Sequence, residues 1–341
     1  MRIKRFSIGF LLLVLFGLFG VLVLQYSYES YLKIPVDKDS KARVVMTVSQ
    51  GETGYDIAKK LSGLDLIPSE FAFYWYLRQS GLGNQLEAGK YILKKSYTIP
   101  ELAEVLTHGK NQEIVVTIRE GLSIEQVDAY LTENGILPAH AFQECAKNCT
   151  IEQRFSFLDS KPKEQSLEGY LFADTYFADP ETISPKELIL KMLKNFEGKL
   201  SSSLRSEIAK RGSSIHQIVT MASLIEKESR SNEEKPVIAG ILWKRLKEKM
   251  VLGVDATVRY AVKKWTGPLT LDDLSINSPY NTRKNAGLPP GPIGNFSADS
   301  LKAAIMPKDS SYYYYLHGSD GAIHYAKTNE EHNLNKQKYL N

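Results

Sequence analysis

Cysteine is scarce in this sequence, because only Cys145 and Cys149 occur among its 341 residues. Two thiolates without further ligands nearby make a poor metal site. In an oxidising compartment the two thiols could pair, and their spacing of four residues would place them on one face of a helix. That geometry strains a disulfide, so two free, partly buried thiols are an equal alternative. The residues alone leave the pairing open.

Several catalytic motifs are missing. The sequence contains no Gly-x-Ser-x-Gly elbow and no glycine-rich phosphate loop, so neither a serine hydrolase nor a nucleotide-binding protein is indicated. His317, His324 and His332 lack the compact spacing of metal ligands and fall at hairpin or terminal turns. We expect neither a metal ion nor a cofactor.

A large excess of charge of one sign is absent as well. The chain has 43 Lys and Arg against 39 Asp and Glu, a formal net charge of +4. A nucleic-acid-binding protein usually carries a larger, clustered excess, and the basic run 244–249 is better interpreted as the solvated face of a helix. We expect no nucleic-acid partner. With 43% hydrophobic and 24% charged residues, the composition is that of a globular protein long enough for two domains.

A long apolar run occurs near the N-terminus. Three basic residues within the first five positions precede an uncharged stretch, 6–28, whose apolar core covers 8–24. About 20 apolar residues cross a bilayer. No small-x-small cleavage site precedes Tyr26, which favours an uncleaved anchor over a signal peptide. The basic residues predict a single pass with the N-terminus in the cytoplasm and the rest of the chain outside.

One short pattern occurs twice, at an offset of 70 residues. A strand over 44–48, a turn at Gly51 and a helix over 55–61 form the first copy. The paired positions are Thr47, Val48, Gly51, Thr53, Ile57 and Leu61 with Thr117, Ile118, Gly121, Ser123, Val127 and Leu131. Each copy predicts a strand, a glycine turn and a capped amphipathic helix. The first copy resembles the opening of a LysM module. Such modules bind polymers that contain N-acetylglucosamine, but a pure packing role is an equal alternative.

The second half of the chain has a different texture. Helices are predicted over 184–200 and 214–229, and a third begins near Pro236. Two short strands, 312–316 and 322–327, flank a Gly-Ser-Asp-Gly turn and predict a hairpin. Helices and strands do not alternate regularly, so the mixed α+β class is favoured.

The helix over 214–229 carries a candidate general acid. Glu226 flanks its apolar stripe, whereas Glu228 is expected nearer the outer face. A carboxyl group held against an apolar surface has a raised pKa, which suits a general acid. On the residues alone, an exposed glutamate paired with Arg230 is the favoured alternative.

Five sequence blocks resemble one family. Segment 221–229, Met-Ala-Ser-Leu-Ile-Glu-Lys-Glu-Ser, is similar to the catalytic helix of the YceG-like family of endolytic murein (lytic) transglycosylases. The other blocks follow in the family's order: a Glu-Gly-Tyr segment at 167–176, an Asp-x-Thr strand at 255–260, segments 278–282 and 287–293, and 328–332. Departures from the family pattern occur at Ala173, Arg283 and 295–297, all outside the glutamate helix.

The resemblance implies a domain organisation and a location. The expected parts are the N-terminus and transmembrane anchor 1–28, the juxtamembrane linker 29–43, the LysM-like module 44–111, and the YceG-like region 112–341 with its α+β catalytic core 166–341. The anchor is expected in the inner (cytoplasmic) membrane, with the catalytic region periplasmic or, more generally, extracytoplasmic. Peptidoglycan synthases are the protein partners that the family implies.

The resemblance also implies a reaction. Members of the family cleave the β-1,4 bond between N-acetylmuramic acid and N-acetylglucosamine in nascent peptidoglycan without water, leaving a 1,6-anhydro end. It implies that Glu226 acts as both acid and base, because the substrate's own 6-hydroxyl is the nucleophile. The residues expected to bind the glycan through ring faces or polar groups are Glu168, Ser223, Asp255, Thr257, Tyr260, Tyr280, Asn281 and Thr282.

Two alternatives remain beside this interpretation. A hydrolytic muramidase would need a second carboxylate, for which Glu168 is the candidate. A tethered, non-catalytic peptidoglycan-binding scaffold would need only the LysM-like module.

Overall fold

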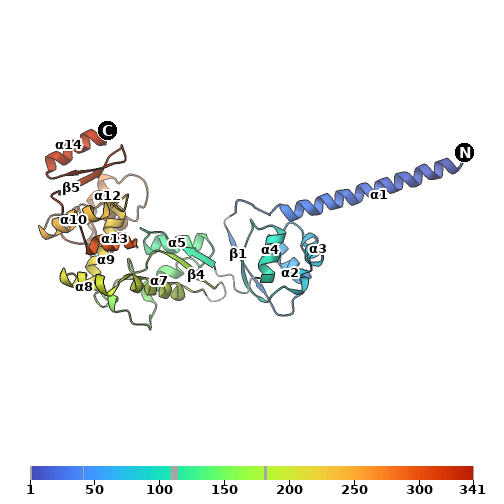
Figure 1. The fold of residues 1–341 in the computed structure, drawn as a ribbon, viewed down its shortest axis with the longest axis horizontal. Coiled ribbons are helices and arrows are strands. Elements are labelled where there is room, and N and C mark those ends of the chain that lie inside the picture. Colours follow the sequence, from blue (N-terminus) through green and yellow to red (C-terminus); the bar gives the residue numbers. More distant parts are fainter. Residues whose placement is uncertain (1, 41, 109–113, 180–182, 341) are drawn as a thin grey trace. The chain divides into compact units, whose positions relative to one another are not determined.

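The computed structural model describes residues 2–40, 42–108, 114–179 and 183–340, with side chains from residue 13 onward except that of residue 43. Its contacts divide the chain into two units (Figure 1). The first comprises Met1–Ile114, Thr132–Ile136 and Phe177–Ile183, and the second comprises Val115–Leu131, Leu137–Tyr176 and Ser184–Asn341. Helices and short two-stranded sheets are mixed, which confirms the α+β class. The boundary expected between 111 and 112 lies outside the described residues.

Helix α1 (Arg2–Lys33) begins the chain. Its segment Leu13–Lys33 is long and apolar enough to cross a membrane and is not buried in the protein. The C-terminal end of α1 contacts the other elements of the first unit. The Tyr28 hydroxyl donates a hydrogen bond to Gln79 Oε1 at 3.1 Å, and Leu32 packs on the unit's core.

The first unit has the order strand, helix, helix, strand, helix: β1 (Arg43–Val48), α2 (Gly54–Gly63), α3 (Glu70–Ser80), β2 (Gly89–Lys94) and α4 (Ile99–His108), with a 3₁₀ turn η1 (Leu82–Asn84). Strands β1 and β2 pair antiparallel in the register Arg43↔Lys94 to Val48↔Gly89. The α2 helix starts where the sequence predicts, because Thr53 and Asp56 form a capping box. Side chains of all three helices and both strands enclose one apolar core.

The elements after residue 113 are β3 (Ile114–Thr117), α5 (Ile124–Glu133), α6 (Ala141–Asn148), η3 (Ser156–Leu158), β4 (Thr175–Ala178), α7 (Pro185–Lys199), α8 (Ser202–Lys210), α9 (Ile215–Glu228), α10 (Lys235–Lys247), α11 (Asp255–Val262), α12 (Leu271–Ser275), α13 (Ala298–Ile305), β5 (Tyr314–His317), β6 (Ile323–Ala326) and α14 (Asn329–Tyr339). The sheets are β3 with β4 and β5 with β6. Helix α9 is the centre of the second unit: residues 218–225 are all buried, and α9 packs on α10, α11 and α13.

Most predicted elements are confirmed, including the repeated pattern. Gly51 (φ +87°) and Gly121 (φ +77°) both adopt the left-handed conformation before a helix. The strand expected over 255–260 is wrong, because this segment is helix α11. The Thr257 hydroxyl donates to the carbonyl of Val254 at 2.7 Å and so closes the first turn. The question left open at the cysteines is answered by a disulfide between Cys145 and Cys149.

Candidate active site

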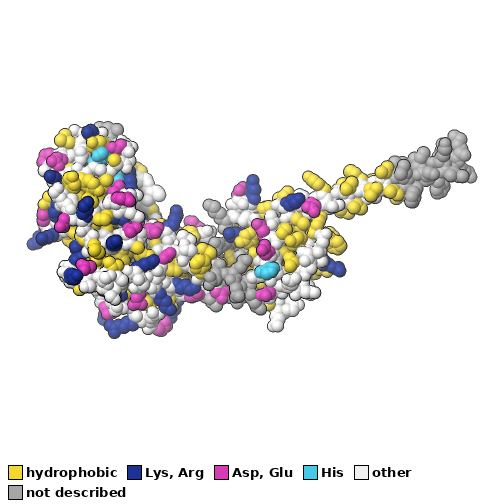
Figure 2. Space-filling view, viewed as in Figure 1, with side chains coloured by type: hydrophobic (Ala, Val, Ile, Leu, Met, Phe, Trp, Pro, Cys, Tyr) yellow, Lys and Arg dark blue, Asp and Glu magenta, His cyan; other side chains and the backbone are white. Residues whose placement is uncertain are grey.

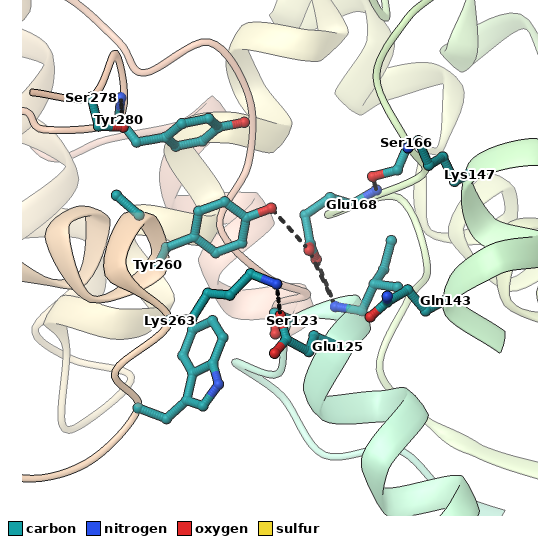
Figure 3. A pocket seen from close by; sticks show the side chains of 13 residues that line it. Ser123, Glu125, Gln143, Lys147, Ser166, Glu168, Tyr260, Lys263, Ser278 and Tyr280 are labelled. Carbon is teal, nitrogen blue, oxygen red and sulfur yellow. Dashed lines mark hydrogen bonds and ion pairs between the residues drawn. The ribbon is translucent and has the colours of Figure 1, made fainter. Parts of the chain in front are cut away.

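An open pocket of about 400 Å³ lies in the second unit. Figure 3 shows the hydroxyl of Tyr260 directed at the carboxyl group of Glu168, with Tyr280 above Tyr260 in this view. The other lining residues are Ser123, Ile124, Glu125, Gln143, Lys147, Ser166, Ala261, Lys263, Trp265 and Ser278. The rings of Tyr260 and Tyr280 lie 5.0 Å apart. Three of the expected glycan-binding residues, Glu168, Tyr260 and Tyr280, therefore meet in one pocket, although they lie 20 to 112 positions apart in the sequence.

Glu168 is 9% exposed and is held by the start of helix α5. Its two oxygens accept the backbone N–H of Ile124 at 3.1 and 3.2 Å, and the Tyr260 hydroxyl donates to it at 3.2 Å. Burial raises the pKa of Glu168 to about 7, although these hydrogen bonds and the charge of Lys227 oppose the rise.

A glycine next to Glu168 is required by the backbone. Gly169 has φ +78°, and a Cβ atom there would lie 2.4 Å from Cβ of Pro292. Only glycine fits both the left-handed conformation and the close approach of the proline. Glu168 thus lines the pocket, and the backbone at Gly169 packs closely against Pro292.

Glu226, on the last turn of α9, joins that helix to α13. Its Oε2 accepts the Ser297 backbone N–H at 2.9 Å, the Ser297 hydroxyl at 2.6 Å and the Ser300 hydroxyl at 2.5 Å. Lys235 Nζ lies 3.3 Å from the same oxygen, so the carboxylate is paired with Lys235. Burial by itself would raise the pKa of Glu226, but these donors outweigh burial and hold the pKa below its usual value. Glu226 is therefore an ionised group at neutral pH.

Glu228 ends helix α9 and has the opposite electrostatic environment. Burial raises its pKa to about 7 against the Tyr315 hydrogen bond, the nearby Asp255 charge adds to the rise, and Arg245 opposes it. The Tyr315 hydroxyl donates to Glu228 Oε2 at 2.8 Å. The expectation that Glu228 lies nearer the outer face needs correction, because its side chain is partly buried and contacts Tyr315 of strand β5. Glu228 can hold a proton near neutral pH.

Four expected glycan-binding residues are buried, with their polar groups engaged inside the protein. Ser223 is 0% exposed, and its hydroxyl donates to the Thr220 carbonyl at 2.7 Å and accepts the N–H of Ile293. The hydroxyls of Thr257 and Thr282 lie 2.9 Å apart. The amide of Asn281 donates to two backbone carbonyls. These residues hold the chain around the pocket, and a direct contact with substrate stays a prediction for them.

Asp255 remains exposed at the first turn of α11. Its Oδ1 lies 2.6 Å from NH1 of Arg283, which is one of the departures from the family pattern. Helix α11 connects the two protonatable glutamates, because Asp255 acts on the pKa of Glu228 and Tyr260 of the same helix contacts Glu168.

The sequence-based reasoning missed four polar residues: Lys235, Ser297, Ser300 and Tyr315. Local pattern offered little signal for them, since each reaches α9 from 9 to 87 positions away. The second glutamate of the Glu-Lys-Glu motif was the available clue for Glu228. Among the residues that the structure describes, no group of three or more His, Cys, Asp or Glu could hold a metal ion.

A buried carboxyl group with a raised pKa in an open pocket is typical of an enzyme active site. The comparison with known families identifies the class of protein. The model of the YceG-like family matches residues 46–338, and the chain belongs to that family.

Named relatives and a solved structure extend the comparison. The chain is 35% identical over 326 residues to the endolytic murein transglycosylase of Bacillus subtilis (strain 168), covering 92% of this chain and 90% of that protein. It is 30% identical to the protein of the same name from Streptococcus pneumoniae (strain D39), covering 100% of this chain and 66% of that protein. A crystal structure of a putative YceG-like protein from Listeria monocytogenes matches with a TM-score of 0.62 and 29% identity, over 86% of this chain and 99% of that one.

Proposed function

We propose that this chain is an endolytic murein transglycosylase. It cleaves the β-1,4 bond between N-acetylmuramic acid and N-acetylglucosamine within peptidoglycan strands and leaves 1,6-anhydro ends. The relatives named for this activity support the substrate. The observation that carries the chemistry is the last turn of α9. There the pKa of Glu226 is lowered, which favours its ionised form, and the pKa of Glu228 is raised to about 7.

Judged by pKa alone, Glu228 fits the proton-transfer role better than Glu226. Neither side chain is among those that line the described pocket around Glu168. A general acid must carry a proton at working pH, and efficiency is greatest when its pKa lies near that pH. A pKa of about 7 meets this requirement for Glu228, whereas the donors around Glu226 favour its ionised form. Glu226 stays the candidate that the family resemblance indicates. In this proposal it is an ionised carboxylate that binds Ser297 and Lys235.

In the proposed reaction Glu228 gives its proton to the glycosidic oxygen as the bond from that oxygen to C1 breaks. The carboxylate then takes the proton of the muramic 6-hydroxyl, whose oxygen forms the new bond to C1. The glutamate ends as it began, and no water is consumed. Tyr260 and Tyr280 offer flat faces to sugar rings in the pocket around Glu168.

The hydrolytic alternative is less well supported. A hydrolase needs an ionised second carboxylate as nucleophile or as the base for water. Burial keeps the pKa of Glu168 at about 7, so about half of the molecules would carry a neutral group at neutral pH. A neutral carboxyl group can still bind sugar hydroxyls, and Glu168 is better suited to that role.

The first unit supplies attachment in this proposal. Helix α1 crosses the inner membrane with its N-terminus in the cytoplasm, and the second unit faces the peptidoglycan. The order β1-α2-α3-β2 is consistent with a LysM-like module that binds the glycan. The alternative function, a non-catalytic scaffold, would depend on this module alone. Peptidoglycan synthases remain the expected partners.

Digestion of isolated peptidoglycan by the purified full-length chain tests the proposal. Mass spectrometry should find internal cleavage products that lack one water relative to hydrolytic products. Glu228→Gln should abolish them, while the matched variant Glu226→Gln should keep part of the activity to the extent that it folds. Reducing, hydrated ends would support a muramidase, and no cleavage by well-folded protein would support the scaffold. Loss of activity only in Glu226→Gln would return the acid role to Glu226.

A further inference from the structure

Two large aromatic side chains on helix α3 are left exposed. Phe71 is 70% exposed and Trp75 is 46% exposed. They stand one turn apart, and their rings stack at 6.1 Å between centroids and 10° between planes. Aromatic groups of this size rarely stay uncovered together without a binding function. A binding partner is therefore expected to cover the pair.

A cavity of about 600 Å³ lies between this aromatic pair and helix α1. Its α1 side includes Val21, Leu24 and Tyr28, and its α3 side includes Phe71 and Trp75. From Val21 to Tyr28 the helix rises about 10 Å at 1.5 Å per residue. The cavity thus extends from the apolar run to the tyrosines near its end.

The depth of this cavity identifies its surroundings. Val21 and Leu24 are 59% and 72% exposed and belong to the run that is apolar enough to cross a membrane. Any residue at their level lies at the edge of the hydrocarbon if α1 spans the bilayer. Tryptophan is enriched at that depth, where its ring is buried and its N–H stays near the headgroups. Figure 2 shows hydrophobic side chains along the described part of α1.

The position of α3 beside α1 is fixed by contacts on the first unit. The hydrogen bond from Tyr28 to Gln79 joins the two helices, and Tyr28 and Leu32 pack against the core of the unit. A membrane that holds α1 would therefore also bring Phe71 and Trp75 to its surface.

We propose that phospholipid of the outer leaflet fills this cavity, with Phe71 and Trp75 inserted in the membrane interface. The first unit then rests on the bilayer through α3 in addition to the span of α1. This inference rests on the proposed membrane anchoring. Lipid is favoured over a sugar chain as occupant, because one wall of the cavity is the proposed membrane helix itself, which is apolar at Val21 and Leu24 and polar further along at Gln25, Ser27 and Glu29.

Tryptophan fluorescence of the full-length chain in liposomes tests the proposal. The sequence has three Trp residues, and lipids brominated high in their acyl chains quench only those in contact with the membrane. We expect a part of the wild-type emission to be quenched. Trp75→Phe should lose that quenched part, and the matched control Trp243→Phe should retain it, because the Trp243 indole is bonded to the Ala304 carbonyl inside the second unit.

Flotation of the same liposomes separates two kinds of failure. Protein that does not float with lipid would overturn the anchoring and this inference together. Floating protein whose quenching is absent, or is unchanged in Trp75→Phe, would overturn the inference alone. Trp75 emission that responds to soluble glycan strands and not to brominated lipid would assign the pair to sugar binding and would also overturn it.

Discussion

Replacing Glu228 by Gln should make the protein more stable while it abolishes cleavage. The pKa of Glu228 is raised from 4.5 to about 7, a difference that corresponds to about 3 kcal/mol between the two protonation states. The unfolded chain releases this proton near pH 4.5, and the folded chain releases it only near pH 7. Between these values the folded state binds more protons, so stability falls as the pH rises.

The neutral amide of Gln carries no such cost and can still accept the Tyr315 hydrogen bond. At pH 8 the variant should therefore unfold with a free energy up to about 3 kcal/mol above that of the wild type. The difference should shrink as the pH falls towards 4.5. Urea unfolding of the full-length chain in a Trp75→Phe background measures it, because the remaining Trp243 and Trp265 both lie in the second unit.

Glu226→Gln is the matched variant, and its sign is opposite. Its carboxylate accepts three hydrogen bonds and faces Lys235, so loss of the charge should cost about 2–3 kcal/mol at pH 8. Because its folded-state pKa is lowered, this loss should lessen as the pH falls below the usual value for Glu. Equal stability changes in the two variants, or a Glu228→Gln effect that does not vary with pH, would refute the reasoning.

Three further outcomes are expected. Tyr260→Phe keeps the ring but removes the hydrogen-bond donor to Glu168. The KM for glycan strands should rise about 3-fold to 10-fold, as expected for the loss of about 1 kcal/mol, and kcat should change little. An equal fall in kcat would contradict a binding role. Asp255→Asn removes a charge that raises the pKa of Glu228, so the alkaline limb of the pH–rate profile should move to lower pH, and a move to higher pH would be inconsistent. Gly169→Ala should cost at least about 2 kcal/mol because of its left-handed backbone, measured by urea unfolding, and a neutral change would show that the loop relaxes freely.

The sequence predicted those elements that local pattern determines. Capped helices with a clear apolar stripe, such as α7 and α9, start within one residue of their expected positions because Ser184 and Ser214 cap them. The strand expected over 255–260 came from the family resemblance and not from the local pattern, and the segment forms helix α11. Thr282 and Arg283, distant in the sequence, contact Thr257 and Asp255 in its first turn.

The residues that line the pocket could be predicted from the sequence better than the pKa values of the glutamates on α9. The family blocks led us to expect Glu168, Tyr260 and Tyr280 in one glycan cleft, and the three residues line one pocket. The pKa values of the α9 glutamates could not be read from α9 itself. The lowered pKa of Glu226 depends on Ser297 and Ser300, more than 70 residues away. The raised pKa of Glu228 depends on burial where Tyr315 of β5 contacts it.

The end of helix α9 has a consequence for proton affinity. Glu228 is the last residue of the helix, where the unpaired backbone carbonyls carry partial negative charge and disfavour a second negative group by about 0.3–1 kcal/mol. The position at which the helix ends therefore affects the pKa of Glu228, in addition to the side chains around it. A sequence change that continued the helix beyond Ser229 would move those carbonyls away and weaken the acid's hold on its proton, without touching any group that faces the carboxyl.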